Sequence, residues 1–243
     1  MEAKLKSGYE LIKVFNAIGH ITDEATLFFK PSGLEIKEID NSGISMLSVA
    51  MQPSLLIEYV ANQELKAGVN IENLNKMLKT IPKGAEFTIS INSIAIEIKT
   101  ENKTYSVPIL ENRNKVEKEP TIEFTNSVIF NVTEFKNALK DLSQISNYAH
   151  INISNNLITL NAEGDSGSVT NDYRNKIIKS NEPITNLCFN IEEMQKLIKE
   201  ADKKGNIEIY LKNNEPLKVV YELAGQKIRG FLAPYIESED EDA

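Results

Sequence analysis

The chain has 243 residues, of which 41% are hydrophobic and 26% are charged, and its formal net charge at pH 7 is −8. This composition indicates a globular protein, and it argues against a membrane-spanning helix because no run of about 18 apolar residues occurs. The negative charge excludes a general electrostatic attraction to nucleic acid. A single cysteine, Cys188, and an N-terminus without an apolar segment indicate a reducing compartment and no secretion signal.

The spacing of apolar residues predicts many short strands and only four helices. Pro31 to Gly33 predicts a turn between two alternating strands, and the Glu-, Lys- and Asn-rich segment 112–124 predicts a connector between domains. In chain order, the predicted elements are a helix at 8–18, strands within 25–39, a helix at 71–81, strands at 87–91, 94–98 and 104–110, a helix at 133–145, strands at 149–153 and 157–162, a helix at 190–203, and strands at 207–211 and 217–223.

The two halves of the chain repeat each other. Residues 70–79 recur as residues 190–199 with five identical positions, at an offset of 120 residues. Other blocks match in the same order at an offset of about 124 residues, a period that suits two domains rather than a solenoid of about 20–50 residues per repeat. We therefore predict an α+β fold of two tandem similar domains, with helices on one face of antiparallel sheets. The predicted boundaries are 1–111 for the first domain, 112–124 for the connector and 125–243 for the second domain.

Two of the predicted helices carry an apolar face and a basic face with the same spacing. On the helix at 71–81, one face is apolar, while Lys76, Lys79 and Lys83 follow a second face, and the helix at 190–203 repeats both. Residues 71–83 sum to a charge of +2 in a chain of −8. An ordinary solvated helix face is the alternative, but the segregated positive charge favours weak, sequence-independent contacts with phosphates. The candidate DNA-facing residues are Lys13, Lys76, Lys79, Lys83, Lys136, Lys140, Lys196, Lys199 and Lys203.

The sequence offers little for catalysis. Residues 164–167 resemble the nucleophile segment of trypsin-like proteases, but only His20 and His150 could act as a base, and the strand pattern is not that of six-stranded barrels. Gly167 is better explained as a turn residue, because Gly43 is its partner in the repeat. One cysteine, two histidines and no clustered acids predict no metal site, and no phosphate-binding loop occurs. We expect no catalytic residues, no metal and no cofactor.

Two segments carry a resemblance to a known family. Residues 34–47 and the closing Phe231-Leu232-Ala233-Pro234, together with the repeat and the connector, resemble the DNA sliding clamps of the proliferating cell nuclear antigen family, most closely the archaeal members. The resemblance covers essentially the whole chain. It implies a processivity factor without catalytic activity, which acts in DNA replication and repair as a head-to-tail trimeric ring around double-stranded DNA. The alternative is a subunit of a heterotrimeric or checkpoint-type clamp.

The resemblance also implies two protein interfaces. An edge strand near residues 104–110 should pair with one near residues 167–174 of the next subunit, and a surface pocket should take short peptides with a glutamine and an aromatic plug. The implied subunit-interface residues are Tyr105, Val107, Ile109, Val169, Asn171 and Tyr173, and the implied pocket residues are Ile39, Gly43, Ile44, Met46, Val116, Pro216, Phe231, Ala233 and Pro234.

The partners implied by the resemblance are DNA, further copies of the chain, and proteins of replication and repair. The proteins are a clamp loader, DNA polymerase, flap endonuclease and DNA ligase, and no membrane partner is expected. The location would be the cytoplasm or nucleoid of an archaeon, or the nucleus of a eukaryote. Tyr235 departs from the basic residue that often follows Ala-Pro in this family.

Overall fold

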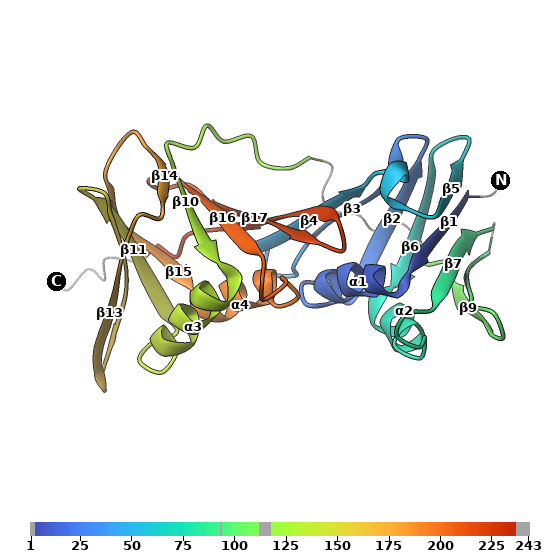
Figure 1. The fold of residues 1–243 in the computed structure, drawn as a ribbon, viewed down its shortest axis with the longest axis horizontal. Helices are drawn as coiled ribbons and strands as arrows, with labels where there is room; N and C mark the ends of the chain where they lie inside the picture. Colours follow the sequence, from blue (N-terminus) through green and yellow to red (C-terminus); the bar gives the residue numbers. More distant parts are fainter. Residues whose placement is uncertain (1–2, 93, 112–117, 237–243) are drawn as a thin grey trace. The chain divides into compact units, whose positions relative to one another are not determined.

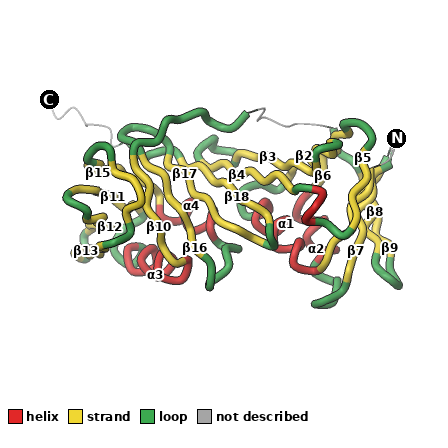
Figure 2. Tube along the Cα trace, turned by 45° about the horizontal axis from the view of Figure 1, so that its top comes forward, coloured by secondary structure: helices red, strands yellow, loops and turns green. Residues whose placement is uncertain are grey.

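The computed structural model describes residues 3–92, 94–111 and 118–236, so Val116 of the proposed pocket lies outside the described residues. Strands are the most abundant elements in this part of the chain, and its helices are short (Figures 1 and 2). The residues divide into two compact units. Unit 1 contains residues 1–120, 197–202 and 221–230, and unit 2 contains residues 121–196, 203–220 and 231–243. The contiguous domain boundaries stated above stay a prediction.

Unit 1 contains two antiparallel sheets and two helices. One sheet has the strand order β5-β1-β7-β8-β9, and the other follows the order β18-β4-β3-β2-β6. The elements are β1 (Ala3–Gly8), the 3-10 turn η1 (Tyr9–Leu11), α1 (Ile12–Gly19), β2 (Glu24–Lys30), β3 (Gly33–Ile39), β4 (Ser45–Met51), the 3-10 turn η2 (Pro53–Leu55), β5 (Glu58–Ala61), β6 (Leu65–Asn70), α2 (Ile71–Leu78), β7 (Glu86–Ile91), β8 (Ala95–Lys99) and β9 (Thr104–Pro108), while β17 (Leu217–Leu223) and β18 (Gln226–Leu232) have residues in both units.

Unit 2 is built in the same way. One sheet has the order β13-β12-β11-β15, and a second run of strands follows the order β14-β10-β16-β17. The elements are β10 (Asn126–Asn131), α3 (Val132–Leu142), β11 (Tyr148–Ser154), β12 (Leu157–Gly164), β13 (Gly167–Arg174), β14 (Ile177–Ser180), β15 (Ile184–Asn190), α4 (Ile191–Ile198), of which the last two residues belong to unit 1, and β16 (Asn206–Leu211).

The strand orders confirm the duplication. The order β5-β1-β7-β8 corresponds to β14-β10-β16-β17, and β4-β3-β2-β6 corresponds to β13-β12-β11-β15. The hydrogen bond made by the first residue of the second helix is also the same in the two halves. The Ile71 N–H donates to the Asp23 carbonyl at 2.8 Å, and the Ile191 N–H donates to the Asn147 carbonyl at 2.9 Å. The predicted α+β fold of two similar halves is therefore confirmed.

Helices α2, α3 and α4 begin where the sequence places an asparagine before an apolar residue, whereas α1 follows Leu11 without a side-chain cap. The Asn70 side chain accepts from the Asn73 N–H at 2.8 Å, and the Asn190 side chain accepts from the Glu193 N–H at 3.1 Å. Such caps satisfy amide groups that have no partner inside the helix. The predicted apolar faces are buried, at Ile71, Leu74, Leu78 and Ile81 after the first cap and at Ile191, Met194, Ile198 and Ala201 after the second.

Three of the four predicted helices are too long at their carboxyl ends, whereas the helix predicted at 8–18 begins late, as the 3-10 turn η1 followed by α1. The helix predicted at 71–81 ends at Leu78, because Pro82 cannot continue a helix and disfavours helical geometry in the residue before it. The helix predicted at 190–203 ends at Ile198, after which the Ala201 N–H bonds back to the Ile198 carbonyl in a tight turn. The helix predicted at 133–145 ends at Leu142.

Helices α1 and α2 pack against each other within unit 1 (Figure 1). The buried Asn75 amide donates to the Phe15 carbonyl at 3.0 Å, and a Cβ at Gly19 would lie only 2.6 Å from the Asn75 Nδ2 atom. Glycine at position 19 therefore permits the close approach of the two helices.

Candidate nucleic-acid and protein interfaces

The nine candidate lysines lie on the helices or in the turns that follow them. Five are helical, namely Lys13, Lys76, Lys136, Lys140 and Lys196, and four follow α2 or α4, namely Lys79, Lys83, Lys199 and Lys203. The sequence prediction was wrong in placing Lys79, Lys199 and Lys203 inside helices, because α2 and α4 end early, and Lys83 lies beyond both the predicted and the observed end of α2. Lys13, Lys136 and Lys196 are half-buried, and the other six are exposed.

The lysines inside α2 and α4 are paired with acids of their own helix. Lys76 lies 2.6 Å from Glu72, and Lys196 lies 3.0 Å from Glu192 and 2.8 Å from Glu193. The hydrogen bonds to Glu193 and Glu192 raise the pKa of Lys196 above its usual value. These pairs occupy equivalent places in the two halves, so part of the expected positive charge is balanced locally.

Four other lysines keep their charge available. Within the described residues, the side chains of Lys79, Lys83, Lys140 and Lys203 form no ion pair. An exposed cation of this kind can contact a phosphate without first losing an intramolecular partner. They are therefore the strongest candidates for contacts with a nucleic-acid backbone.

Strand β9 forms an open edge of its sheet in unit 1. The Ile109 N–H donates to the Ile94 carbonyl at 3.2 Å, and hydrogen-bonded pairs alternate in an antiparallel ladder. Tyr105, Val107 and Ile109 therefore direct their main-chain groups to β8, and the intervening residues face the open edge. Val107 is also only 2% exposed. The main-chain groups available for a neighbour are those of Thr104 and Ser106 and the carbonyl of Pro108, not those of the three residues named from sequence.

Strand β13 forms an open edge in unit 2. Val169, Asn171 and Tyr173 lie half-buried on one face, between exposed neighbours. The Tyr173 ring meets the Phe130 ring edge-on at 5.0 Å. Burial raises the pKa of Tyr173, with nearby Glu134 and Asp141 adding to the effect. Both strands proposed from the resemblance as pairing partners are therefore sheet edges within the chain.

The Asp40 carboxylate organises the turn between β3 and β4. Its Oδ1 atom accepts from the Ile44 N–H at 2.8 Å and from the Ser45 N–H at 2.9 Å, and its Oδ2 atom accepts from the Ser42 hydroxyl. Burial alone would raise the pKa of Asp40, but these hydrogen bonds outweigh it and lower the pKa. Gly43 has a φ of +75°, a conformation that favours glycine. The turn presents Ile44 with 42% of its surface exposed.

The proposed pocket residues are divided between the two units. In unit 1, Ile39 and Met46 face each other across β3 and β4, and Met46 is 5% exposed. In unit 2, the segment after β18 is anchored because the Tyr235 N–H donates to the Cys188 carbonyl at 2.8 Å and the Tyr235 ring packs on Tyr148 at 4.1 Å. Phe231 is buried there, and Pro216, Ala233 and Pro234 are half-buried.

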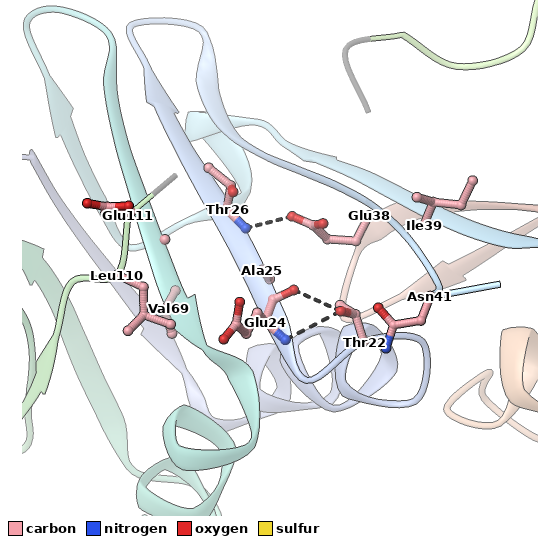
Figure 3. Close-up of a pocket in the computed structure, with 11 residues that line it drawn as sticks. Thr22, Glu24, Ala25, Thr26, Glu38, Ile39, Asn41, Val69, Leu110 and Glu111 are labelled. Atoms are coloured by element: carbon pink, nitrogen blue, oxygen red, sulfur yellow. Dashed lines mark hydrogen bonds between the residues drawn. The ribbon is translucent and has the colours of Figure 1, made fainter. Parts of the chain in front are cut away.

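A cavity that the sequence did not indicate opens in unit 1 where β2 and β3 separate. Its volume is about 170 Å³. Figure 3 shows the Glu38 carboxylate pointing at the Thr26 N–H, which donates to it at 2.6 Å. Gly68 is required at this cavity, since a Cβ there would lie 2.8 Å from the Leu110 carbonyl oxygen. The lining residues are Thr22, Glu24, Ala25, Thr26, Glu38, Ile39, Asn41, Gly68, Val69, Leu110 and Glu111.

The end of the connector carries a polar cluster that the sequence also did not indicate. The Arg229 guanidinium donates from Nε to both Glu119 oxygens at 2.8 and 3.0 Å, and its Nη2 atom lies 2.7 Å from Glu119 Oε1. The Ser48 hydroxyl donates to Glu119 at 2.6 Å and accepts from Arg229 at 3.2 Å. Burial alone would raise the pKa of Glu119, but the hydrogen bonds from Arg229 and Ser48 outweigh it and lower the pKa.

The protease-like segment is a hairpin turn. Gly164 pairs with Gly167 at the end of the β12–β13 hairpin, and Gly167 has a φ of +129°. The described residues contain no group of His, Cys, Asp and Glu side chains that could hold a metal ion, and no helix among them is long and apolar enough to cross a membrane.

A duplicated α+β chain with paired antiparallel sheets, open edge strands and exposed lysines after its helices has the architecture of a processivity clamp. Family models confirm this class. The model of the proliferating cell nuclear antigen N-terminal domain matches residues 1–126, and the model of the C-terminal domain matches residues 118–236. The chain therefore belongs to the proliferating cell nuclear antigen family, the DNA polymerase sliding clamps.

Similar proteins extend over nearly the whole chain. The DNA polymerase sliding clamp of Methanococcus maripaludis is 25% identical over 93% of this chain and 95% of its own length. That of Nitrosopumilus maritimus is 24% identical over 97% of this chain and 98% of its own length. Among solved structures, A. fulgidus PCNA bound to the C-terminal region of FEN-1 superposes with a TM-score of 0.89 at 23% identity, over 98% of this chain and 100% of that one. A chain of the Sulfolobus tokodaii PCNA2–PCNA3 complex superposes with a TM-score of 0.82 at 20% identity, over 96% of this chain and 99% of that one.

Proposed function

We propose that three copies of this chain close head to tail into a ring that encircles duplex DNA and carries replication and repair enzymes along it. The ring acts without catalytic chemistry of its own. Topological trapping then provides the long residence on DNA, and direct contacts with DNA need only be weak.

The observation that carries the proposal is the placing of two open edges in a duplicated fold. Within unit 1, β4 has β18 as its hydrogen-bonded neighbour. The duplication makes β13 the counterpart of β4, and makes β9 the counterpart of β18 as the last strand of its half. The counterparts β9 and β13 are both open edges, so a second copy can satisfy each of them in the way that β18 satisfies β4. Such pairing joins unlike surfaces and generates a closed ring when the rotation allows it.

The lysines support a sequence-independent contact with the enclosed duplex. Lys79, Lys83, Lys140 and Lys203 carry exposed charges without an ion pair among the described residues. The chain as a whole has a charge of −8, so electrostatic repulsion keeps DNA from other faces. Contacts of this kind weaken steeply with salt and permit sliding.

Partner docking is proposed for the turn of unit 1 that presents the exposed Ile44. The A. fulgidus structure holds the C-terminal region of FEN-1 on its clamp, and by analogy this chain would bind short peptides of flap endonuclease, DNA polymerase, DNA ligase and the clamp loader. An exposed apolar side chain on an ordered turn suits the anchor of such a peptide.

The test is the solution mass of the purified chain, measured by light scattering, for wild type and S106P. The wild type should have three times the chain mass of 27.3 kDa. Proline at position 106 removes an outward N–H that β8 does not use, so the fold should survive while the ring dissociates. S106A keeps that N–H and should remain trimeric.

Two results would contradict the proposal. A trimeric S106P protein would show that β9 does not form the junction. A monomeric wild type would favour a heteromeric clamp, of the kind represented by the PCNA2–PCNA3 complex of S. tokodaii.

A further inference from the structure

The described residues on both sides of segment 112–117 are fixed to unit 1. Before this segment, the Leu110 N–H donates to the Gly68 carbonyl at 2.8 Å. After it, Glu119 lies between Ser48 and Arg229 with four contacts of 2.6 to 3.0 Å. The first contact is a single main-chain hydrogen bond. The second joins three side chains through an ion pair and a hydroxyl hydrogen bond.

The geometry of this second contact is that of a strong ion pair. Arg229 uses two nitrogens on one carboxylate, and charge-assisted bonds with several donors are stronger and more directional than single neutral ones. Ser48 is fully buried at the base of the cluster, and the side chains of Glu119 and Arg229 are each 24% exposed. The carboxylate is therefore partly shielded from water, which strengthens the pair relative to one on an open surface.

The cluster also lies beside the proposed peptide anchor. Ser48 pairs with Lys37 across β4 and β3, and two residues further along the same strands Met46 pairs with Ile39. Residues two apart on a strand point to the same face, about 7 Å apart. Ser48 and Met46 thus share one face of β4, so Glu119 is anchored next to Ile39 and Met46, which the family resemblance implies for the peptide pocket and which lead into the turn that presents Ile44.

We propose that Arg229 and Ser48 act as positioning residues that fix the Glu119 end of the connector for partner binding. The proposal rests on the proposed function, because it assigns these residues to the same docking site. Removing the anchor would let residues 118–120 leave their place, and a peptide would then bind only the fraction of molecules in which the segment is still in position. The apparent affinity falls in proportion to that fraction.

The chain offers a matched control for the removal of an ion pair. Lys30 lies 2.7 Å from Glu35 in the same unit, and their side chains are 29% and 24% exposed. Replacing Lys30 by Gln removes a pair of similar exposure that does not hold the connector. The variants to compare are wild type, R229Q, K30Q and the charge swap E119R/R229E.

Two measurements test the proposal. The first is the binding of a fluorescein-labelled peptide with a glutamine and an aromatic plug, measured by anisotropy. R229Q should bind roughly three- to tenfold more weakly than wild type, while K30Q binds like wild type and the charge swap regains most of the affinity. The second is hydrogen–deuterium exchange of the segment that contains residues 118–120, which should speed up in R229Q but not in K30Q.

Each outcome has a defined meaning. Unchanged exchange at 118–120 in R229Q would overturn the anchoring, whether or not any peptide binds. Faster exchange with unchanged peptide affinity would overturn the link to partner binding. An affinity that falls in R229Q and is not regained by the charge swap would show that Arg229 acts by another route, such as direct contact with the peptide. A wild-type protein that binds no such peptide would contradict the proposed docking function itself, while the exchange measurement would still decide whether Arg229 holds the connector.

Discussion

Replacing Asp40 tests how much one side chain stabilises the turn between β3 and β4, which presents Ile44. Replacing Asp40 by Ala removes the acceptor of the Ser45 and Ile44 amides. Ser45 is fully buried, so water cannot replace the missing partner of its N–H, whereas Ile44 is exposed and its amide can bond to water. An unsatisfied buried donor costs about 1–3 kcal/mol, so we expect D40A to lower the free energy of unfolding by about 2 kcal/mol.

The Asp40→Asn variant separates shape from charge. Asparagine keeps an oxygen in the place of Oδ1, so it preserves both amide bonds and gives up mainly the interactions of the charged Oδ2 atom with Ser42. We expect the free energy of unfolding to fall by less than about 1 kcal/mol. Urea denaturation measures both values, and peptide anisotropy measures whether the turn still presents Ile44. Equal destabilisation by D40A and D40N, or an undiminished stability in D40A, would refute the assignment of the stability to the Oδ1 bonds.

The same carboxylate predicts a pH dependence with a definite sign. Because the pKa of Asp40 is lower in the folded protein than in the unfolded chain, its contribution is complete above the unfolded value of about 3.9 and disappears as the pH falls through the lower folded value. The difference in stability between wild type and D40A should therefore stay constant from pH 8 to about pH 5 and shrink only in stronger acid. A difference that disappears near neutral pH would have to come from another group.

Two further predictions follow from particular side chains. In K79A/K83A, a plot of the logarithm of DNA affinity against the logarithm of salt concentration should be less steep. Its slope should change by about 0.9 for each phosphate that is no longer neutralised. An unchanged slope would show that these lysines do not contact DNA. In G68A, the new methyl group would lie 2.8 Å from the Leu110 carbonyl oxygen, so residues 109–111 must shift. We expect the free energy of unfolding to fall by about 1–3 kcal/mol and hydrogen exchange at residues 109–111 to speed up. An unperturbed variant would show that this close approach is not required.

The features that repeat in the sequence were predictable, and those made by long-range contacts were not. The apolar faces of α2 and α4 follow from spacing, and their caps follow from Asn70 and Asn190. Strand β4 was missed because it is buried on both sides, and its run Ser45–Met51 therefore lacks the alternation that identifies a strand with one wet face.

Fewer features of the candidate sites than of the fold could be predicted from the sequence. In the sequence, Glu119 cannot be distinguished from the other polar residues of the charged connector. Its partners Ser48 and Arg229 are 71 and 110 residues away, so no local pattern predicts the contact. The resemblance indicated β9 as an edge strand. Which main-chain groups of β9 face outward, however, depends on its register with β8, which the sequence does not show. A one-residue change of register would exchange the two sets.

The charge distribution on the helices also bears on how a clamp can hold DNA without stopping on it. Lys76 and Lys196 have the same place in the two halves, and both form an i,i+4 pair with a preceding glutamate. This orientation stabilises a helix by about 0.3–0.5 kcal/mol and removes net charge from its surface. Of the nine candidate lysines, those without an ion pair among the described residues follow the helix ends at Lys79, Lys83 and Lys203, or lie on α3 at Lys140. The duplicated arrangement thus limits each helix to a few exposed cations. Because each neutralised phosphate adds to the salt-dependent affinity, a small number of cations would keep binding weak enough for movement, while the ring that we propose would prevent escape.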